Sequence, residues 1–485
     1  MHISKPLRLA RFATGVLLSL GLVLVGLQAQ AAATIVIQNM NAAGEGFNDP
    51  TPAAPVGGNF GTTLGQQRLI AFQAAADQWG ATLTSTQTIV IRASFEPLTC
   101  TASSAVLGSA GAWNIWRDFA GAAKPNTWYP QALANKLSGT NLSAGDPVDG
   151  QDIRARFNSR LGLFADCLPG SPFYLGLDNN HGPLIDLVTV LLHEFGHGLG
   201  FQTFTSGSSG VQFDGRPSIW DHYLYDNSAN ALWVNMTDAQ RATSALNTRK
   251  LAWAGANVTN SLPSVLSLGT PFLAISGPAA GAATGTYNIG TASFGASLGS
   301  PGVSGQLMPV VDTGTSTGLA CTPLSPINAL AVNGRIALVD RGTCTFAVKA
   351  KNAQDAGAIG VIIANNVAGS APALGGADPT VTIPVIGISQ ADGVTLRAAL
   401  AKRTRTTSGV IATFGVNTSQ YAGADLVGRA LLFTPNPFQG GSSVSHFDTL
   451  ATPNQLMEPA INGDLLHTVL PPYDLTFRLL QDIGW

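Results

Sequence analysis

One apolar segment of this chain carries a cluster of ionisable side chains. Residues 185–199 (IDLVTVLLHEFGHGL) are apolar almost all round a helix, a pattern typical of a helix buried in a protein core. His193, Glu194 and His197 interrupt that pattern near its C-terminal end. Because an unpaired carboxylate is costly to bury, the fold must provide these side chains with partners inside the core.

The spacing of these side chains is the H-E-x-x-H pattern. Helix positions i and i+4 share one face, so His193 and His197 can reach the same metal ion. Glu194 lies beside them, where it can act as a general base toward an attacking water. Zinc suits neutral imidazoles and keeps one position open at a catalytic site. A random chain with seven histidines and this composition would contain the pattern in roughly one case per thousand.

Two histidines leave such a site one ligand short. In metzincin peptidases the motif extends as H-E-x-x-H-x-x-G-x-x-H. This chain has the glycine, Gly200, but the position of the third histidine is Thr203, a poor zinc ligand. Asp221, His222 and His446 remain as candidates further along the chain.

The C-terminal segment, residues 442–485, favours one of these candidates through a resemblance. It contains Ser-His-Phe-Asp at 445–448, Leu-Met-Glu-Pro-Ala at 456–460 and a final Gln-Asp-Ile-Gly-Trp. This order resembles the leishmanolysin branch of the metzincins, in which a distant histidine is followed by a methionine turn. The resemblance implies that His446 is the third zinc ligand and that Met457 is the hydrophobic floor beneath the metal.

The cysteines and the N-terminus both bear on the compartment. Residues 1–31 combine a basic start, an apolar run shorter than the roughly twenty residues needed to span a bilayer, and a small-x-small cleavage site. They therefore predict a secretory signal. In an oxidising compartment Cys100, Cys167, Cys321 and Cys344 predict disulfides, with three possible pairings. Pairing sequence neighbours keeps each bond within one candidate domain.

A shift in composition toward Gly, Ala, Ser, Val and Ile marks residues 268–415. Strands are expected there at 333–340, 358–364 and 383–389, with helices at 346–356 and 390–402. This alternation predicts a small α/β domain. Residues 333–366 and 383–393 resemble the protease-associated (PA) domain. The resemblance implies an inserted domain over residues 268–417, in which Cys321 and Cys344 form a clasp.

The predicted fold is an α+β metzincin-like catalytic domain with a mixed sheet and the H-E-x-x-H helix, interrupted by the inserted α/β PA domain. Its expected parts are a signal at 1–31, a first catalytic part at 34–267, the PA domain at 268–417 and a second catalytic part at 418–485. Outside the insert, helices are expected at 66–79, 185–199 and 474–482, a strand at 88–93 and a half-buried edge strand at 152–158. Because the ends of an inserted domain lie close together, His446 can lie beside His197.

Together these features predict a secreted zinc-dependent endopeptidase that acts on proteins or peptides, with one catalytic zinc ion and Glu194 as the general base. Calcium sites are plausible in an exported peptidase, but no loop motif locates one. Charged residues at 11% and a net charge of −2 give no basis for a nucleic-acid partner. No second apolar run is long enough to anchor the chain in a membrane after signal removal.

Three alternatives remain open. The chain could be a PA-domain binding protein that retains a weak or inactive zinc site, a zinc hydrolase that acts on bonds other than peptides, or a scaffold without metal. The presence of Glu194 favours catalysis over a structural zinc site, because a structural site needs no base.

Overall fold

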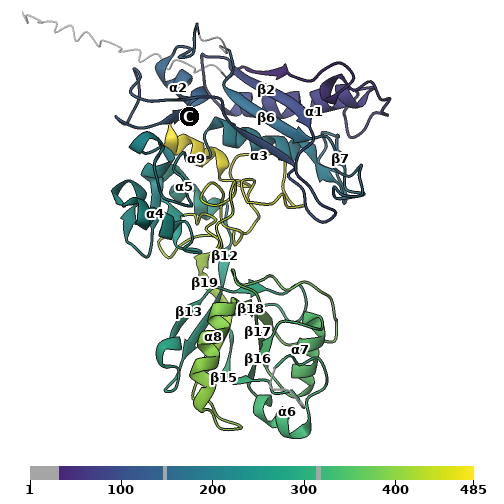
Figure 1. Ribbon diagram of the computed structural model, residues 1–485, viewed down its shortest axis with the longest axis vertical. Coiled ribbons are helices and arrows are strands. Elements are labelled where there is room, and N and C mark those ends of the chain that lie inside the picture. The colour runs from purple at the N-terminus through teal and green to yellow at the C-terminus, as the bar shows by residue number, and fades with distance from the viewer. Residues whose placement is uncertain (1–31, 146–149, 313–317) are drawn as a thin grey trace, which may run out of the picture.

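The computed structural model describes residues 32–145, 150–312 and 318–485, so the signal expected at residues 1–31 lies outside the described part. Figure 1 shows two bodies joined through strands β12 (Leu268–Ser276) and β19 (Ile411–Tyr421). We call residues 32–267 together with 422–485 the main unit, and residues 268–421 the inserted unit. The buried core of the main unit draws on both of its segments, whereas the two core clusters of the inserted unit are built from its own residues. The chain is therefore a mixed α/β protein in which one unit interrupts another.

A four-stranded sheet of the main unit has the strand order β1-β2-β6-β3. Its strands are β1 (Ile35–Asn39), β2 (Ile89–Glu96), β6 (Ile153–Asn158) and β3 (Gly108–Ala112). β1, β2 and β6 run parallel, and β3 is antiparallel to β6. Along β2 the buried residues alternate with half-buried ones, as the alternating apolar side chains require for a sheet with one face on the core.

The prediction that residues 152–158 form an edge strand is wrong. β6 lies between β2 and β3, so its backbone is paired on both sides. The strand that covers it, β3, reads Gly-Ser-Ala-Gly-Ala and lacks the β-branched and aromatic residues that predict strands. The two edge strands of the sheet are therefore β1 and β3.

Helices α1 (Leu64–Thr82) and α3 (Leu187–Leu199) pack on the same face of this sheet and against each other. The ring of Phe72 in α1 lies 4.9 Å from that of Phe157 in β6 and 5.9 Å from that of Phe195 in α3, measured between centroids. The Trp79 indole donates to the Leu192 carbonyl at 3.1 Å. These contacts fix α3 as a fully buried helix, as its apolar sequence predicts.

The rest of the main unit surrounds this layer. Its other helices are α2 (Gln131–Ser138), α4 (Asp238–Ser244), α5 (Ala256–Ser261) and α9 (Thr476–Ile483), and its shorter strands are β4 (Ile115–Trp116), β5 (Tyr129–Pro130), β7 (Phe173–Tyr174), β8 (Ile185–Asp186), β9 (Leu224–Asp226), β10 (Ala231–Leu232) and β11 (Leu251–Trp253). The C-terminal Trp485 donates its indole N–H to the Leu199 carbonyl at 2.7 Å. The end of the chain is thereby attached to the end of α3.

The inserted unit is built on an eight-stranded sheet with the order β13-β12-β19-β15-β16-β17-β18-β14. Its remaining elements are β13 (Gly285–Tyr287), β14 (Gly290–Thr291), β15 (Val303–Pro309), β16 (Ile336–Asp340), β17 (Gly360–Ala364), β18 (Val385–Ile388), α6 (Pro326–Val332), α7 (Phe346–Asp355) and α8 (Gln390–Ala399). The strands and helices predicted between residues 333 and 402 are all present. The unit begins and ends at one point, where Ala422 N–H donates to the Ser267 carbonyl at 2.9 Å.

Both disulfides join sequence neighbours, Cys100 with Cys167 and Cys321 with Cys344. The first lies in the main unit and the second in the inserted unit. Within the described ranges, no helix has the length and apolar character that a membrane crossing requires.

Candidate metal centre

Helix α3 holds the motif between two defined ends. At its start the Asp186 carboxylate accepts the Thr189 N–H at 2.7 Å, which is an N-cap bond. At its end Gly200 has φ 125°, and a Cβ at this position would come within 2.9 Å of Ile483 and 3.0 Å of Pro130. Only glycine suits this turn, and the turn directs the Phe201 carbonyl back toward the helix.

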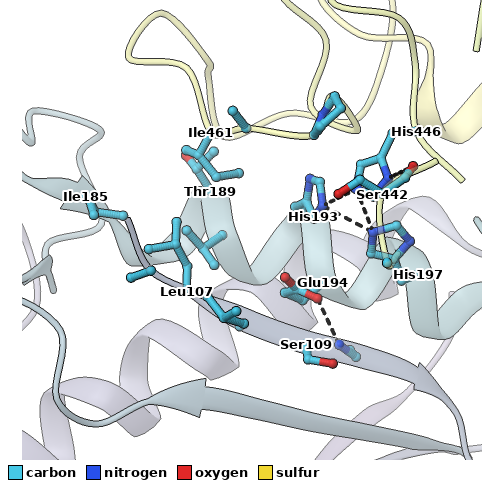
Figure 2. A pocket seen from close by; sticks show the side chains of 18 of the residues that line it. Leu107, Ser109, Ile185, Thr189, His193, Glu194, His197, Ser442, His446 and Ile461 are labelled. Atoms are coloured by element: carbon cyan, nitrogen blue, oxygen red, sulfur yellow. Dashed lines mark hydrogen bonds between the residues drawn. The ribbon is translucent and has the colours of Figure 1, made fainter. Parts of the chain in front are cut away.

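His446 reaches α3 from the far end of the chain through backbone pairing. The Phe433 N–H donates to the His446 carbonyl at 2.9 Å, and the Phe447 N–H donates to the Met457 carbonyl at 2.8 Å. The segment around His446 therefore lies between residues 431–433 and the turn at Met457. This arrangement places the His446 ring against the polar end of α3 (Figure 2).

The three histidines meet at their Nε2 atoms. His193 and His197 are 3.2 Å apart at these atoms, His197 and His446 are 3.2 Å apart, and His446 and His193 are 3.3 Å apart. Among the described residues, these three side chains form the group that could hold a metal ion. Their ligand atoms all lie within 4.8 Å of one another. Three donors placed around zinc at the usual distance and tetrahedral angles would be about 3.3 Å apart.

Each ring is fixed in one tautomer by its other nitrogen. The Nδ1 atoms of His193, His197 and His446 lie 2.7, 2.8 and 2.8 Å from the carbonyl oxygens of Leu456, Phe201 and Ser442, respectively. A carbonyl oxygen only accepts, so Nδ1 carries the hydrogen and Nε2 presents a lone pair. Three lone pairs directed at one another could hold a metal cation between them, and this donor set fits zinc.

The electrostatics keep the rings neutral, as metal ligation requires. Burial lowers the pKa of His193 to about 4, and burial together with the nearby His193 lowers the pKa of His197 to about 3. Burial and the two neighbouring rings also hold the pKa of His446 well below its ordinary value. No proton therefore competes for the Nε2 atoms at neutral pH.

Glu194 lies beside the three rings in the same cleft, whose volume is about 1070 Å³. One carboxylate oxygen accepts the Ala110 N–H of the edge strand β3 at 2.8 Å (Figure 2). Burial raises the pKa of Glu194 to about 8, and the Ala110 hydrogen bond opposes this rise. A Cβ on Gly108 would lie 3.0 Å from the Glu194 side chain, so the glycine of β3 leaves room for the carboxylate.

Met457 lies directly beneath the motif and is fully buried. A Cβ built on Gly196 would come within 3.0 Å of the Met457 sulfur, so the two residues are in close contact. The turn that carries Met457 also supplies the Leu456 carbonyl to His193. Met457 therefore lies against the turn of α3 between His193 and His197, and its role as the floor of a metal site stays a prediction.

The other candidate ligands are bonded elsewhere. Asp221 is fully buried and accepts the hydroxyl groups of Thr203 and Thr205, both at 2.6 Å. His222 lies 3.0 Å from the Thr127 hydroxyl through its Nε2 atom. His467, which the sequence did not suggest as a ligand, contacts the Asp186 carboxylate at 2.8 Å. None of these side chains joins the group of three histidines.

Several groups at the site have no signature in the sequence. The carbonyls that hold the rings and the Ala110 N–H are backbone atoms, which every residue carries. The Gly-rich strand β3 has no strand pattern, and the cleft loop at residues 440–443 has no motif. The capping Asp186 offered the one usable signal, because an acidic residue before an apolar helix is a common N-cap.

Comparison with known proteins adds a family to one part of the chain. Residues 303–396 match the PA domain. The match agrees with the resemblance seen in the sequence. It extends from the start of β15 into α8, and is narrower than the expected span of 268–417. The flanking strands β12 and β19 lie in the same sheet as the matched stretch.

Similar proteins with assigned names are mostly aminopeptidases. Leucine aminopeptidase 2 of Arthroderma otae is 47% identical over 83 residues, which are 17% of this chain and 17% of the relative. The probable lipoprotein aminopeptidase LpqL of Mycobacterium tuberculosis is 40% identical over 106 residues, 21% of this chain and 20% of the relative. This chain thus spans no more than about a fifth of either relative. Neither stretch can contain both His197 and His446, which are 249 residues apart.

Solved structures give a weaker comparison. The zinc aminopeptidase BSAP from Bacillus subtilis is 25% identical, with a TM-score of 0.22 and coverage of 33% of this chain and 36% of its own. The subtilisin-like protease Apa1 from Pseudoalteromonas sp. AS-11 is 19% identical, with a TM-score of 0.21 and coverage of 32% and 35%. At these scores the likeness carries no argument about the main unit.

Proposed function

We propose that the protein is a secreted zinc metallopeptidase of the leishmanolysin-like metzincin type, which cleaves internal peptide bonds. The observation that carries this proposal is the convergence of three neutral Nε2 atoms on one point beside a buried glutamate. The three imidazoles of His193, His197 and His446 would hold the ion. Zinc at this point would polarise a substrate carbonyl and make an attacking water more acidic.

Glu194 has the position of the general base. Its carboxylate takes a proton from the water that attacks the carbonyl, and then delivers this proton to the nitrogen of the leaving amine. The Ala110 N–H holds one of its oxygens in place. A dication next to Glu194 would lower the carboxyl pKa from about 8, which favours the ionised form at neutral pH.

The edge strand β3 supports cleavage within a chain. Gly108, Ser109 and Ala110 line the cleft, and β3 pairs with β6 on one side only. An extended peptide can add to such an edge through backbone hydrogen bonds. Apolar residues Leu107, Ile185 and Ile461 line the cleft on the side of His193 away from His446 (Figure 2), and they suit an apolar substrate side chain.

Release of N-terminal residues is a second candidate activity, and the names of the relatives favour it. That likeness covers at most about a fifth of the chain and never the whole histidine group, so it supports a peptidase more than a cleavage position. A third possibility is a PA-domain binding protein that keeps zinc without hydrolysis. A single assay separates the three.

The assay uses purified protein with measured zinc content and two substrates. One is a quenched fluorescent peptide blocked at both ends, and the other is leucine p-nitroanilide with a free amino group. We expect cleavage of the blocked peptide alone and its loss on treatment with a chelator. Cleavage of the anilide alone would replace our proposal with an aminopeptidase. Bound zinc without either reaction would identify a binding protein.

Substitution of the base tests the mechanism. Glu194→Gln should retain one zinc ion per chain, since no metal-binding nitrogen changes, and should lose about 10²- to 10⁴-fold in kcat. The matched control is Glu96→Gln, at a partly exposed carboxylate that pairs with Arg156, and we expect it to retain full activity. Undiminished hydrolysis by Glu194→Gln would rule out this mechanism.

A further inference from the structure

The inserted unit contacts the main unit near the segment that carries His446. The Asn288 side chain donates to the Thr248 carbonyl at 3.3 Å, and the Arg249 Nη1 donates to the Ile289 carbonyl at 3.1 Å. Ile289 is 1% exposed and belongs to the core of the inserted unit, so its carbonyl moves with that unit. These bonds attach the two units to each other in addition to the covalent connection through β12 and β19.

The same arginine faces the main unit through a second atom. Its Nε lies 3.8 Å from the Asp448 Oδ1, and the two side chains are 18% and 4% exposed. Asp448 follows His446 by two residues and accepts the Leu450 N–H at 3.0 Å. One guanidinium therefore spans the distance from the inserted unit to the turn that follows the third histidine.

The turn that carries Arg249 is tied to His446 by a second route. The Thr434 hydroxyl donates to the Asn247 carbonyl at 2.9 Å, and the neighbouring Phe433 N–H donates to the His446 carbonyl at 2.9 Å. The turn itself is closed by the Lys250 N–H, which donates to the Asn247 carbonyl at 3.0 Å. A displacement of this turn would thus be transmitted to the histidine segment.

The backbone at Arg249 is strained. Its φ is 62°, in the left-handed region that is unfavourable for a non-glycine residue. Glycine would remove that strain. The side-chain contacts of Arg249 must therefore offset the strain, and a strained residue at a junction of two units points to a specific task.

We propose that Arg249 is a positioning residue that couples docking of the inserted unit to the placement of His446. Without the guanidinium, the Asp448 carboxylate is left buried without its cation, and the turn after His446 relaxes to solvate it. The inserted unit then helps to hold His446 in its place at the metal site. This inference rests on the proposed function only in taking His446 as a metal ligand.

The test compares three substitutions at one position. Arg249→Met keeps the side-chain volume without the charge, Arg249→Gly relieves the backbone strain, and Arg249→Lys keeps a charge facing Asp448. We expect the Met and Gly variants to bind zinc about 10- to 100-fold more weakly, the usual loss for a residue that acts through a ligand. Zinc affinity is measured by competition with a chromogenic chelator. Arg249→Lys should recover part of the loss, and Arg405→Met, at an exposed arginine of the inserted unit, should change nothing.

Hydrogen exchange supplies a readout independent of metal. We expect faster exchange at residues 444–451 in the Met and Gly variants than in the wild type, with β2 unchanged. In the active enzyme kcat should fall with little change in KM. A purely structural turn predicts the opposite for Arg249→Gly, namely equal or higher stability with wild-type zinc affinity. That result, together with unchanged exchange, would overturn the proposal.

Three further outcomes remain decisive. If Arg249→Met does not fold, Asn288→Ala removes a contact from the inserted side and should speed exchange at residues 247–251 and 444–451; unchanged exchange there would refute the coupling. If the wild type binds zinc but hydrolyses nothing, the peptidase proposal fails while the affinity and exchange measurements still decide the role of Arg249. If the wild type binds no zinc, the premise that His446 is a metal ligand fails and the proposal is overturned with it.

Discussion

At each of the three histidines, a backbone carbonyl decides which ring nitrogen is free. The carbonyls of Leu456, Phe201 and Ser442 come from three different segments, so the direction of every lone pair depends on tertiary structure. The helix alone cannot orient these rings. The metal centre is therefore assembled only when the segments have folded together.

Substitution of single histidines tests whether His446 or His222 is the third zinc ligand. We expect His446→Ala to weaken zinc binding by at least about 100-fold, more than the loss of a residue outside the ligand set. His222→Ala should retain wild-type affinity, because His222 is bonded to Thr127. Zinc titration of the two variants checks this. Equal losses, or a loss only in His222→Ala, would contradict the assignment.

Glu458, next to Met457, should make stability depend on pH. Burial raises its pKa to about 8 in the folded protein, against about 4.5 when unfolded. Between these values the folded state binds more protons, so the contribution of Glu458 to stability is fully present below about pH 4.5 and is lost as pH rises toward 8. We expect Glu458→Gln, in chelator-treated protein, to show a smaller fall in the urea midpoint from pH 5 to 8.

The control for that experiment is Glu96→Gln, which replaces a half-exposed carboxylate on β2. It should leave the pH dependence as in the wild type. If Glu458→Gln also shows the wild-type fall in the urea midpoint from pH 5 to 8, other buried groups cause the pH dependence.

Residue chemistry in the sequence was sufficient to place His193, Glu194 and His197 together, because their grouping follows from spacing on one helix. Nothing in the residues alone chose among Asp221, His222 and His446. Asp221 is buried and carries a carboxyl group, as a ligand would, but two threonine hydroxyls donate hydrogen bonds to it. Only the fold distinguishes a satisfied carboxylate from an available one.

At the scale of elements, α3 packs so closely on β6 at Gly198 that a larger side chain at this position has no room. A Cβ on Gly198 would lie 2.4 Å from the Ile153 side chain. We expect Gly198→Ala to lower the free energy of unfolding by roughly 1–3 kcal/mol, as overpacking of a core does. Chemical denaturation measures this change. Gly440→Ala, where nothing lies within 4 Å, should be near neutral, and equal losses in both would refute the packing argument.

Elements with strong periodicity were predictable, and elements without it were not. α1 and α3 follow the apolar patterns of their sequences, and the buried strands β16 and β17 follow continuous apolar runs. β3 has only Gly, Ser and Ala, so its strand conformation comes from pairing with β6. Because the sequence did not predict β3, it placed β6 at the edge of the sheet. The strand that borders the cleft was therefore not recognised.

At the scale of the whole molecule, the two disulfides belong to separate units. The loop closed by Cys100–Cys167 has a separation of 67 residues, and that of Cys321–Cys344 has 23. Loop-closure entropy predicts stabilisation by about 4 and about 3 kcal/mol, respectively. We expect Cys321→Ala/Cys344→Ala to lower the stability of the inserted unit while β2 and α1 keep their hydrogen-exchange protection.

The converse variant, Cys100→Ala/Cys167→Ala, should reduce protection in the main unit and spare β16 and β17. Equal losses in both units from either pair would mean that the molecule unfolds as one body. The shift in composition predicted the insertion, but not the bonds from Asn288 to Thr248 and from Arg249 to Ile289 that join the two units. Such contacts involve residues without any local pattern.

The separation of 249 residues between His197 and His446 also sets an order of events during synthesis. A growing chain contains the two helical nitrogens long before the third leaves the ribosome. With His446 as a ligand, the unfinished polypeptide cannot complete the group of three nitrogens, so the candidate site can form only after residue 446 has been synthesised.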